Sequence, residues 1–283
     1  IPFDTVLEKL AELKFDGVEL GGFNGYPNPQ NHPTKEDREA LKQKVAGHGL
    51  AFSGFAQDLW SEHLLDTDDP TQYIESFKAH AQFAVDLGIK GIRVDTVQPP
   101  TIHKSIDYDT LFSRLTSVWD RCINYAGDKG LYVTWEFEPG FAFNKPSDIQ
   151  RVLDALPHKN FGVMYDTCHG QMVAVNGVRQ EGAKETLPGG QLEFIEKLSG
   201  RINHIHLIDS DNTCHKDAQG NDETSSHTPF SEGVIDFDDI VPALAKENVG
   251  HDWWTICLCF WPDAWNATAK CKTALDALNR KYG

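Results

Sequence analysis

Short apolar runs alternate along this chain with segments in which apolar residues recur at the period of a helix. The runs are rich in β-branched and aromatic residues, and they cover 17–20, 51–55, 91–96, 131–138, 161–166, 202–209 and 253–259. Seven strands separated by helices are typical of repeated βα units on a parallel sheet. We therefore predict an α/β protein with one domain that spans residues 1–283.

The repeated unit favours a (β/α)8 TIM barrel, which needs eight strands, each followed by its helix. Here a helix pattern precedes the first run, so we expect one strand before Ile1 to be missing from this sequence. Helix starts are expected at Asp4, Thr34, Ser147 and Asp236, which are capping residues placed before apolar periodic segments. Two long polar stretches, 23–33 and 215–233, are expected to be loops above the barrel mouth.

Composition narrows the class of partner. The chain has 26 Lys and Arg against 42 Asp and Glu, a formal net charge of −16, which disfavours nucleic acid and anionic membrane surfaces. No apolar run approaches the roughly 20 residues of a membrane span, and the first residues lack the pattern of a secretory signal. We expect a cytoplasmic protein with a small-molecule substrate. The six cysteines have no regular spacing and are expected to be reduced thiols.

Three successive predicted strands end in side chains that bind metals. One ends in Glu138 before Pro139, with Glu136 on the same face and one layer deeper; the next ends in Asp166, and the third carries His204 and His206. Taken alone, each of these residues is explained equally well as a salt-bridged residue at the rim of the barrel. Together, oxygen and imidazole ligands at neighbouring strand ends predict a site for one divalent ion.

Several short motifs, in this order, carry a resemblance to a known family. They are Phe15-Asp16-Gly17-Val18-Glu19-Leu20, Glu138-Pro139, Asp166-Thr167-Cys168-His169, His204-Ile205-His206-Leu207 and Glu232-Gly233-Val234-Ile235-Asp236-Phe237. The chain resembles the sugar isomerase/epimerase family with the xylose-isomerase-like barrel, which also contains dehydratases and an abasic-site endonuclease branch. The resemblance implies that Glu138, Asp166 and His206 are metal ligands and that His169 contacts the substrate. It also implies a homo-oligomer.

The fourth ligand in this family is usually a glutamate near the end of the last strand, where this chain has Cys257. A thiolate there makes the site softer and favours zinc or ferrous iron over magnesium, whereas a neutral thiol leaves three protein ligands. The resemblance admits Mn, Mg, Co or Zn as the single ion. In the epimerase branch two metal-bound glutamates exchange protons with the substrate, so the loss of one affects the acid–base pair.

A divalent ion beside one carboxylate suits reactions that begin by removing a proton next to a carbonyl group. We expect a sugar isomerase or epimerase that acts on a small sugar or polyol derivative through an enediolate, with Glu138 and His169 as catalytic residues. His169, Trp60, Trp261 and Glu232 are the candidate substrate contacts, although the aromatic residues fit a core role at least as well and Glu232 fits a solvated loop better. The alternatives are a metal-dependent lyase and a sugar-binding protein without turnover. The acidic charge argues against an endonuclease.

Overall fold

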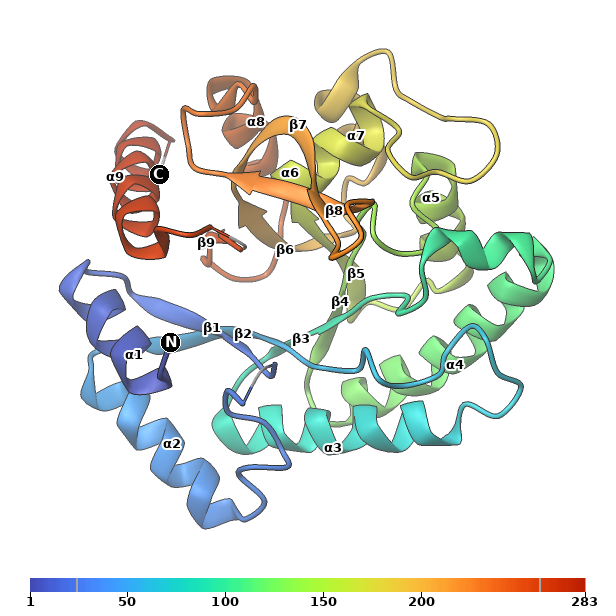
Figure 1. The fold of residues 1–283 in the computed structure, drawn as a ribbon. Coiled ribbons are helices and arrows are strands. Elements are labelled where there is room, and N and C mark those ends of the chain that lie inside the picture. Colours follow the sequence, from blue (N-terminus) through green and yellow to red (C-terminus); the bar gives the residue numbers. More distant parts are fainter. Residues whose placement is uncertain (24, 260, 283) are drawn as a thin grey trace.

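The computed structural model describes residues 1–23, 25–259 and 261–282, and a seven-stranded parallel sheet forms its centre (Figure 1). The sheet has the order β1-β2-β3-β4-β5-β6-β9, and every neighbouring pair is parallel. The strands are β1 (Gly17–Gly21), β2 (Ala51–Ala56), β3 (Gly91–Val94), β4 (Tyr132–Glu136), β5 (Phe161–Asp166), β6 (Ile202–Leu207) and β9 (Thr255–Ile256). The seven predicted strands are confirmed in order and position.

The sheet curls into a nearly closed barrel that stays open between its first and last strands. Within the described residues β1 and β9 share no backbone pairing; the Thr255 hydroxyl reaches Glu19 across the opening at 3.4 Å. A cavity of about 870 Å³ lies at this edge, with Phe15, Trp253 and Trp265 in its wall. The TIM-barrel type of fold is therefore confirmed with seven strands. The expectation of a further strand before Ile1 stays a prediction.

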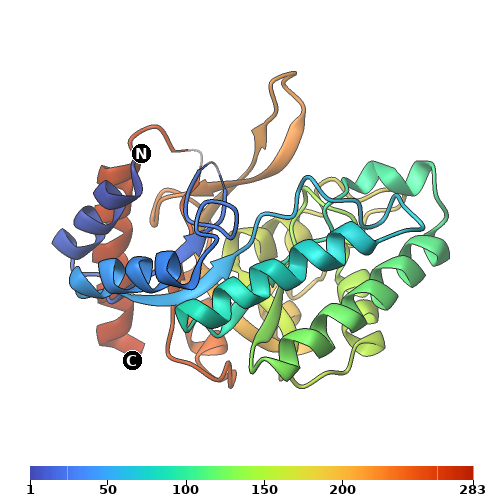
Figure 2. The same ribbon diagram turned by 90° about the horizontal axis from the view of Figure 1, so that it is seen from below.

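Helices cover the outside of the barrel, as the two views show (Figure 1, Figure 2). They are α1 (Phe3–Glu12), α2 (Lys35–Gly47), α3 (Thr71–Leu87), a 3₁₀ turn (Pro100–Lys104), α4 (Tyr108–Asp128), α5 (Pro146–Ala155), α6 (Thr167–Gly170), a π turn (Gln171–Val175), α7 (Gly190–Lys197), α8 (Phe237–Leu244) and α9 (Ala264–Tyr282). Their inner faces join the strands in one cluster of buried apolar residues. Within the described part of the chain, no helix is both long and apolar enough to cross a membrane.

Two of the four expected helix starts are confirmed. Thr34 forms a complete capping box with Asp37, and Asp236 caps α8 by accepting the backbone N–H of Asp238. The other two were wrong by two residues, because the residue that caps α1 is Pro2 rather than Asp4 and the one that caps α5 is Lys145 rather than Ser147. A proline precedes α1 and another begins α5, and proline fixes the backbone for a helix start without a side-chain cap.

The segment expected to be a loop over the mouth is mostly a β-hairpin. The strands β7 (Asp209–Lys216) and β8 (Asp222–Thr228) pair in antiparallel fashion, and the tip of the hairpin extends away from the barrel (Figure 2). Most side chains near the tip are exposed and polar, so the alternation of apolar and polar residues that marks a half-buried strand is absent. The base of β8 is buried and lies over the mouth.

Candidate metal centre

Four side chains that can bind a metal meet at the mouth of the barrel. They are Glu136 at the end of β4, Asp166 at the end of β5, His206 on β6 and Cys257 just after β9, and their ligand atoms all lie within 4.8 Å of one another. The register explains the meeting, because Asp166 pairs with His206 in the sheet. Three of the four residues are buried. Sequence reasoning predicted Asp166, His206 and Cys257 as ligands, and the structure brings these three together.

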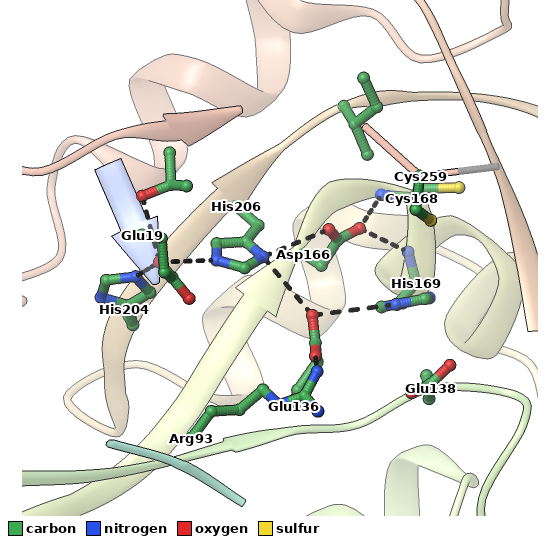
Figure 3. A network of polar contacts seen from close by, with 12 residues as sticks. Glu19, Arg93, Glu136, Glu138, Asp166, Cys168, His169, His204, His206 and Cys259 are labelled. Carbon is green, nitrogen blue, oxygen red and sulfur yellow. Dashed lines mark hydrogen bonds and ion pairs between the residues drawn. The ribbon is translucent and has the colours of Figure 1, made fainter. Parts of the chain in front are cut away.

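Polar atoms at this cluster lack hydrogen-bond partners, which fits a bound cation. Asp166 Oδ2 and His206 Nδ1 are buried and make no hydrogen bond, although buried polar atoms are almost always paired. His206 Nδ1 lies 3.4 Å from Glu136 Oε1 and 3.8 Å from Asp166 Oδ2 (Figure 3). Two carboxylates, an imidazole and a thiol form a donor set suited to a borderline divalent ion such as zinc.

The carboxylate from β4 in this cluster belongs to Glu136, whereas the sequence pointed to Glu138. Strand β4 ends at Glu136, and the chain then turns through Pro139 and Gly140, so Glu138 does not continue the path of the strand. Figure 3 shows Glu138 apart from the network around Asp166. Its Oε2 instead accepts a hydrogen bond from the Thr224 hydroxyl on β8. Among the described residues, Glu138 belongs to no group of candidate metal ligands.

Glu136 is held by a buried arginine. Arg93 on β3 donates from Nη1 to Glu136 Oε2 at 2.5 Å and from Nη2 to Asp95 Oδ2 at 3.2 Å. Burial alone would raise the pKa of Glu136, but the Arg93 guanidinium together with His206 and His169 outweighs burial and lowers that pKa. By contrast, burial and the neighbouring Glu136 charge raise the pKa of Glu138 to about 8. The two carboxyl groups of one strand end thus have opposite protonation tendencies.

The electrostatics of His206 and Cys257 also indicate a cation. Burial would lower the pKa of His206, but Glu19, Cys257 and Glu136 together outweigh burial and hold that pKa well above its ordinary value. Burial raises the pKa of the Cys257 thiol to about 12. Without a metal, the pocket therefore attracts protons. A divalent ion bound to these atoms displaces the protons, which is the usual coupling between metal binding and proton release.

A second group shares Asp166 and lies toward the hairpin. It contains His169 of α6 and His227 of β8 with Asp166, again within 4.8 Å. Asp166 Oδ1 accepts the backbone N–H groups of Cys168 and His169, which fixes the first turn of α6, and Ser225 Oγ lies 2.9 Å from His169 Nδ1. Burial lowers the pKa of each imidazole to about 4. His169 was predicted, whereas His227 was missed because its strand was expected to be a loop.

The predicted substrate contacts fall in different places. Trp60 is half-exposed at the mouth, where its ring lies 4.6 Å from Phe23 and its indole N–H donates to Asp95 at 2.9 Å. Trp261 is half-buried between β9 and α9. Glu232 is exposed and pairs with Lys270 of α9. The roles of Trp60, Trp261 and Glu232 as substrate contacts stay predictions.

A glutamate that sequence reasoning left outside the site lies on the other side of His206. Glu19 of β1 accepts hydrogen bonds from His204 Nε2 at 2.7 Å and His206 Nε2 at 3.1 Å, and the three residues form a further group of potential ligands. The signal for Glu19 in the sequence was an acidic residue in the middle of an otherwise apolar strand.

All six cysteines are free thiols, as expected.

Most of the chain is similar to known proteins. The model of the xylose isomerase-like TIM barrel family matches residues 7–281. A curated relative, an inosose dehydratase of Geobacillus thermodenitrificans, is 23% identical over 274 residues, which cover 90% of this chain and 81% of the relative.

Solved structures show the same fold at low identity. The IOLI protein with a bound zinc atom has a TM-score of 0.74 at 15% identity, and the match covers 100% of this chain and 95% of the IOLI chain. D-psicose 3-epimerase of Clostridium cellulolyticum with D-tagatose has a TM-score of 0.70 at 16% identity, with 99% and 93% of the two chains covered. Together with the strand-end cluster, the family match shows that the chain belongs to the xylose isomerase-like TIM barrel family.

Proposed function

We propose that this protein is a divalent-metal-dependent lyase that removes water from a small ketone of the sugar or cyclitol class. The observation that carries the proposal is the cluster of Glu136, Asp166, His206 and Cys257, with its buried and unpartnered donor atoms. The curated relatives support elimination as the outcome, since inosose dehydratases match about nine-tenths of the chain at 20–23% identity. Isomerisation or epimerisation, the first expectation from sequence, becomes the second candidate.

The ion would be held by Glu136, Asp166, His206 and Cys257, with Glu136 in the role that was predicted for Glu138. A bound divalent ion stabilises the negative charge that develops on a carbonyl oxygen when a proton leaves the neighbouring carbon. Cys257 and His206 make zinc or ferrous iron better suited than magnesium. Arg93 keeps one oxygen of Glu136 occupied, which leaves Oε1 to face the cluster.

Elimination of water needs one group that takes a proton from carbon and one that gives a proton to the departing hydroxyl. We assign this pair to His169 and Glu138, which are buried beside the four-residue cluster and outside it. Neighbouring residues of β8 hold both groups, because Thr224 donates to Glu138 and Ser225 contacts His169. The hairpin therefore positions the proton-transfer groups over the metal ligands and covers them from water.

The aromatic residues at the mouth are suited to a ring-shaped substrate. Trp60 lies between Phe23 and Phe141, and its hydrogen bond to Asp95 fixes the indole near Arg93. Such faces stack on the C–H face of a sugar or cyclitol. We expect Trp60→Ala to raise KM by up to about tenfold, from roughly 0.5–1.5 kcal/mol of lost stacking, with no change in metal affinity.

Epimerisation remains the second candidate because it shares the first proton removal. It needs a proton-transfer group on each face of the substrate, and by the family resemblance Cys257 stands where epimerases carry one of theirs. Elimination needs no such second carboxylate, which favours the lyase. Cys257→Glu restores the epimerase pattern and Cys257→Ser serves as its size-matched control.

The test is a product analysis with the metal-loaded protein and a panel of keto-cyclitols, ketoses and aldoses. A lyase converts a keto-cyclitol or ketose to an unsaturated ketone, which absorbs in the ultraviolet, and we expect this from the wild-type chain. An epimer formed by wild type without that absorbance contradicts the lyase proposal. If wild type binds sugars by calorimetry and changes none of them, the protein is a metal-stabilised binding protein.

A further inference from the structure

The imidazoles on the far side of His206 are held by hydrogen bonds on both ring nitrogens, in contrast to the metal cluster. His251 Nδ1 accepts the backbone N–H of Trp253 at 3.1 Å. A backbone N–H can only donate, so a neutral His251 carries its proton on Nε2. That nitrogen lies 3.1 Å from both the Asn203 carbonyl oxygen and His204 Nδ1, and it therefore donates toward them.

The same reasoning fixes the next imidazole. His204 Nδ1 faces the donor Nε2 of His251 and also lies 3.1 Å from the Tyr132 hydroxyl. Because Nδ1 accepts, His204 carries its proton on Nε2, which donates to Glu19 Oε2 at 2.7 Å (Figure 3). His204 thus faces two donors at Nδ1 and an acceptor at Nε2, so only one neutral tautomer fits this position.

The hydrogen bond to Glu19 also determines which nitrogen of His206 carries the proton. Its Oε2, an acceptor, lies 3.1 Å from His206 Nε2, so Nε2 of His206 carries the proton. The lone pair of a neutral His206 is then on Nδ1, the unpartnered nitrogen that faces Glu136 and Asp166. A carboxylate that holds the distal nitrogen of a metal-binding imidazole orients the ring and increases its basicity.

We propose that Glu19 is a positioning residue that commits His206 to bind the metal through Nδ1, with His204 and His251 fixing the direction of the hydrogen bonds. This role rests on the proposed metal centre and extends it to three residues that bind neither metal nor substrate. Strand β1, which supplies Glu19, lies at the open edge of the barrel. The hydrogen bond between Glu19 and His206 thus connects the metal centre to the edge of the sheet that β1 forms.

The rival arrangement places the ion among Glu19, His204 and His206 themselves. The hydrogen-bonding pattern argues against it, because the facing atoms of these residues already satisfy one another, whereas the unpartnered atoms lie on the other side of His206. An ion held there must displace both hydrogen bonds to Glu19. The two arrangements differ in which nitrogen of His206 binds the metal.

The first measurement uses wild-type protein labelled with ¹⁵N-histidine, with and without zinc. Long-range ¹H–¹⁵N spectra identify the protonated and metal-bound nitrogens of each imidazole, and His206→Gln assigns the His206 signals. We expect Nδ1 of His206 to bind zinc and Nε2 to stay protonated. Binding through Nε2, or a metal-bound His204, overturns the proposal while leaving a metal centre in place.

The second measurement compares zinc affinity in competition with a chromophoric chelator. In Glu19→Gln the amide oxygen can still accept from both imidazoles, but it carries no negative charge and no longer increases the basicity of His206, so we expect a loss of about 10–100-fold. Tyr132→Phe removes one donor to His204 and leaves His251 in place, so its affinity should match wild type within about twofold. Equal affinities of Glu19→Gln and wild type contradict the proposal.

These readouts do not depend on turnover, so they separate the two proposals. Wild type that takes up no zinc contradicts the metal centre and the lyase together. Wild type that binds zinc through Nδ1 of His206 but acts on no ketone supports the role of Glu19 and rejects the proposed reaction. Thermal unfolding of the metal-free variants tests whether each is folded.

Discussion

The metal cluster takes its residues from two unlike parts of the barrel. Glu136, Asp166 and His206 come from β4, β5 and β6, which are five or six residues long, pair on both sides and are almost fully buried. Cys257 follows β9, a strand of two half-buried residues with one neighbour in the sheet. Three candidate ligands therefore stand on a rigid scaffold and the fourth on an open edge.

This difference indicates a division of roles within the cluster. A ligand held by packed strands is preorganised and contributes most to metal affinity, whereas one at an edge contributes less and can adapt to the ion. The pattern of hydrogen bonds agrees, because Arg93 and the α6 backbone hold Glu136 and Asp166. The variants below test whether the enclosed side and the edge contribute as unequally as the structure indicates.

The largest effect is expected at Arg93. Arg93→Met leaves the buried carboxylates of Glu136 and Asp95 without their cation, and breaking a buried pair in this way costs about 3–5 kcal/mol. Urea unfolding of the metal-free protein measures the loss. Lys44→Met, which removes an exposed pair with Asp4, is the control and should change stability by less than about 1 kcal/mol. Equal losses of stability in the two variants would mean that the buried ion pairs of Arg93 stabilise the enclosed side no more than an exposed pair does.

Asp166→Asn should abolish most metal binding while preserving the fold. The amide oxygen can still accept the two N–H groups of α6, but an NH2 group replaces Oδ2, the atom that faces His206. We expect zinc affinity to fall at least about a hundredfold, or roughly 2.7 kcal/mol, by chelator competition. Asp109→Asn, at an exposed position of α4, is the matched control. Retained affinity would show that Asp166 is no ligand.

Glu138→Gln should change how stability depends on pH in the metal-free protein. The folded-state pKa of Glu138, about 8, lies above its ordinary 4.5, so its contribution to stability is complete below 4.5 and is lost as pH rises through 8. The variant cannot titrate there. Its stability relative to wild type should therefore rise between these values, by at most about 1.4 kcal/mol per pH unit. Glu12→Gln is the control. If the stability of Glu138→Gln and of wild type changes in parallel across this pH range, the raised pKa of Glu138 is contradicted.

The smallest effect is expected at the edge. Cys257→Ser replaces a soft ligand atom by a hard one of similar size, and we expect zinc affinity to fall about tenfold, or roughly 1.4 kcal/mol, with little change for magnesium. The two ions are compared in the same competition assay. A loss as large as that of Asp166→Asn would place Cys257 on an equal footing with the enclosed ligands and remove the proposed distinction.

Much of the architecture was readable from periodicity, because buried parallel strands are continuous apolar runs that a helix-period segment separates. The seven strands follow this rule, and so do the strand-end positions of the candidate ligands Asp166 and His206. The β7–β8 hairpin escaped detection since its exposed, polar tip has no apolar side to produce a pattern. His227 was missed with it, although it lies in the second group of candidate ligands.

The sequence by itself determined the order of the strands, the resemblance to the family and a group of candidate metal ligands at the strand ends, with a cysteine near the last of them. Only the tertiary structure decided that Glu136 rather than Glu138 faces Asp166, because period two places both on one face and only the observed end of β4 distinguishes them. It also decided that Glu19, far away in the chain, supports His206. Periodicity reports which side of its own strand a residue faces, whereas the partners it meets depend on how separate strands pack together.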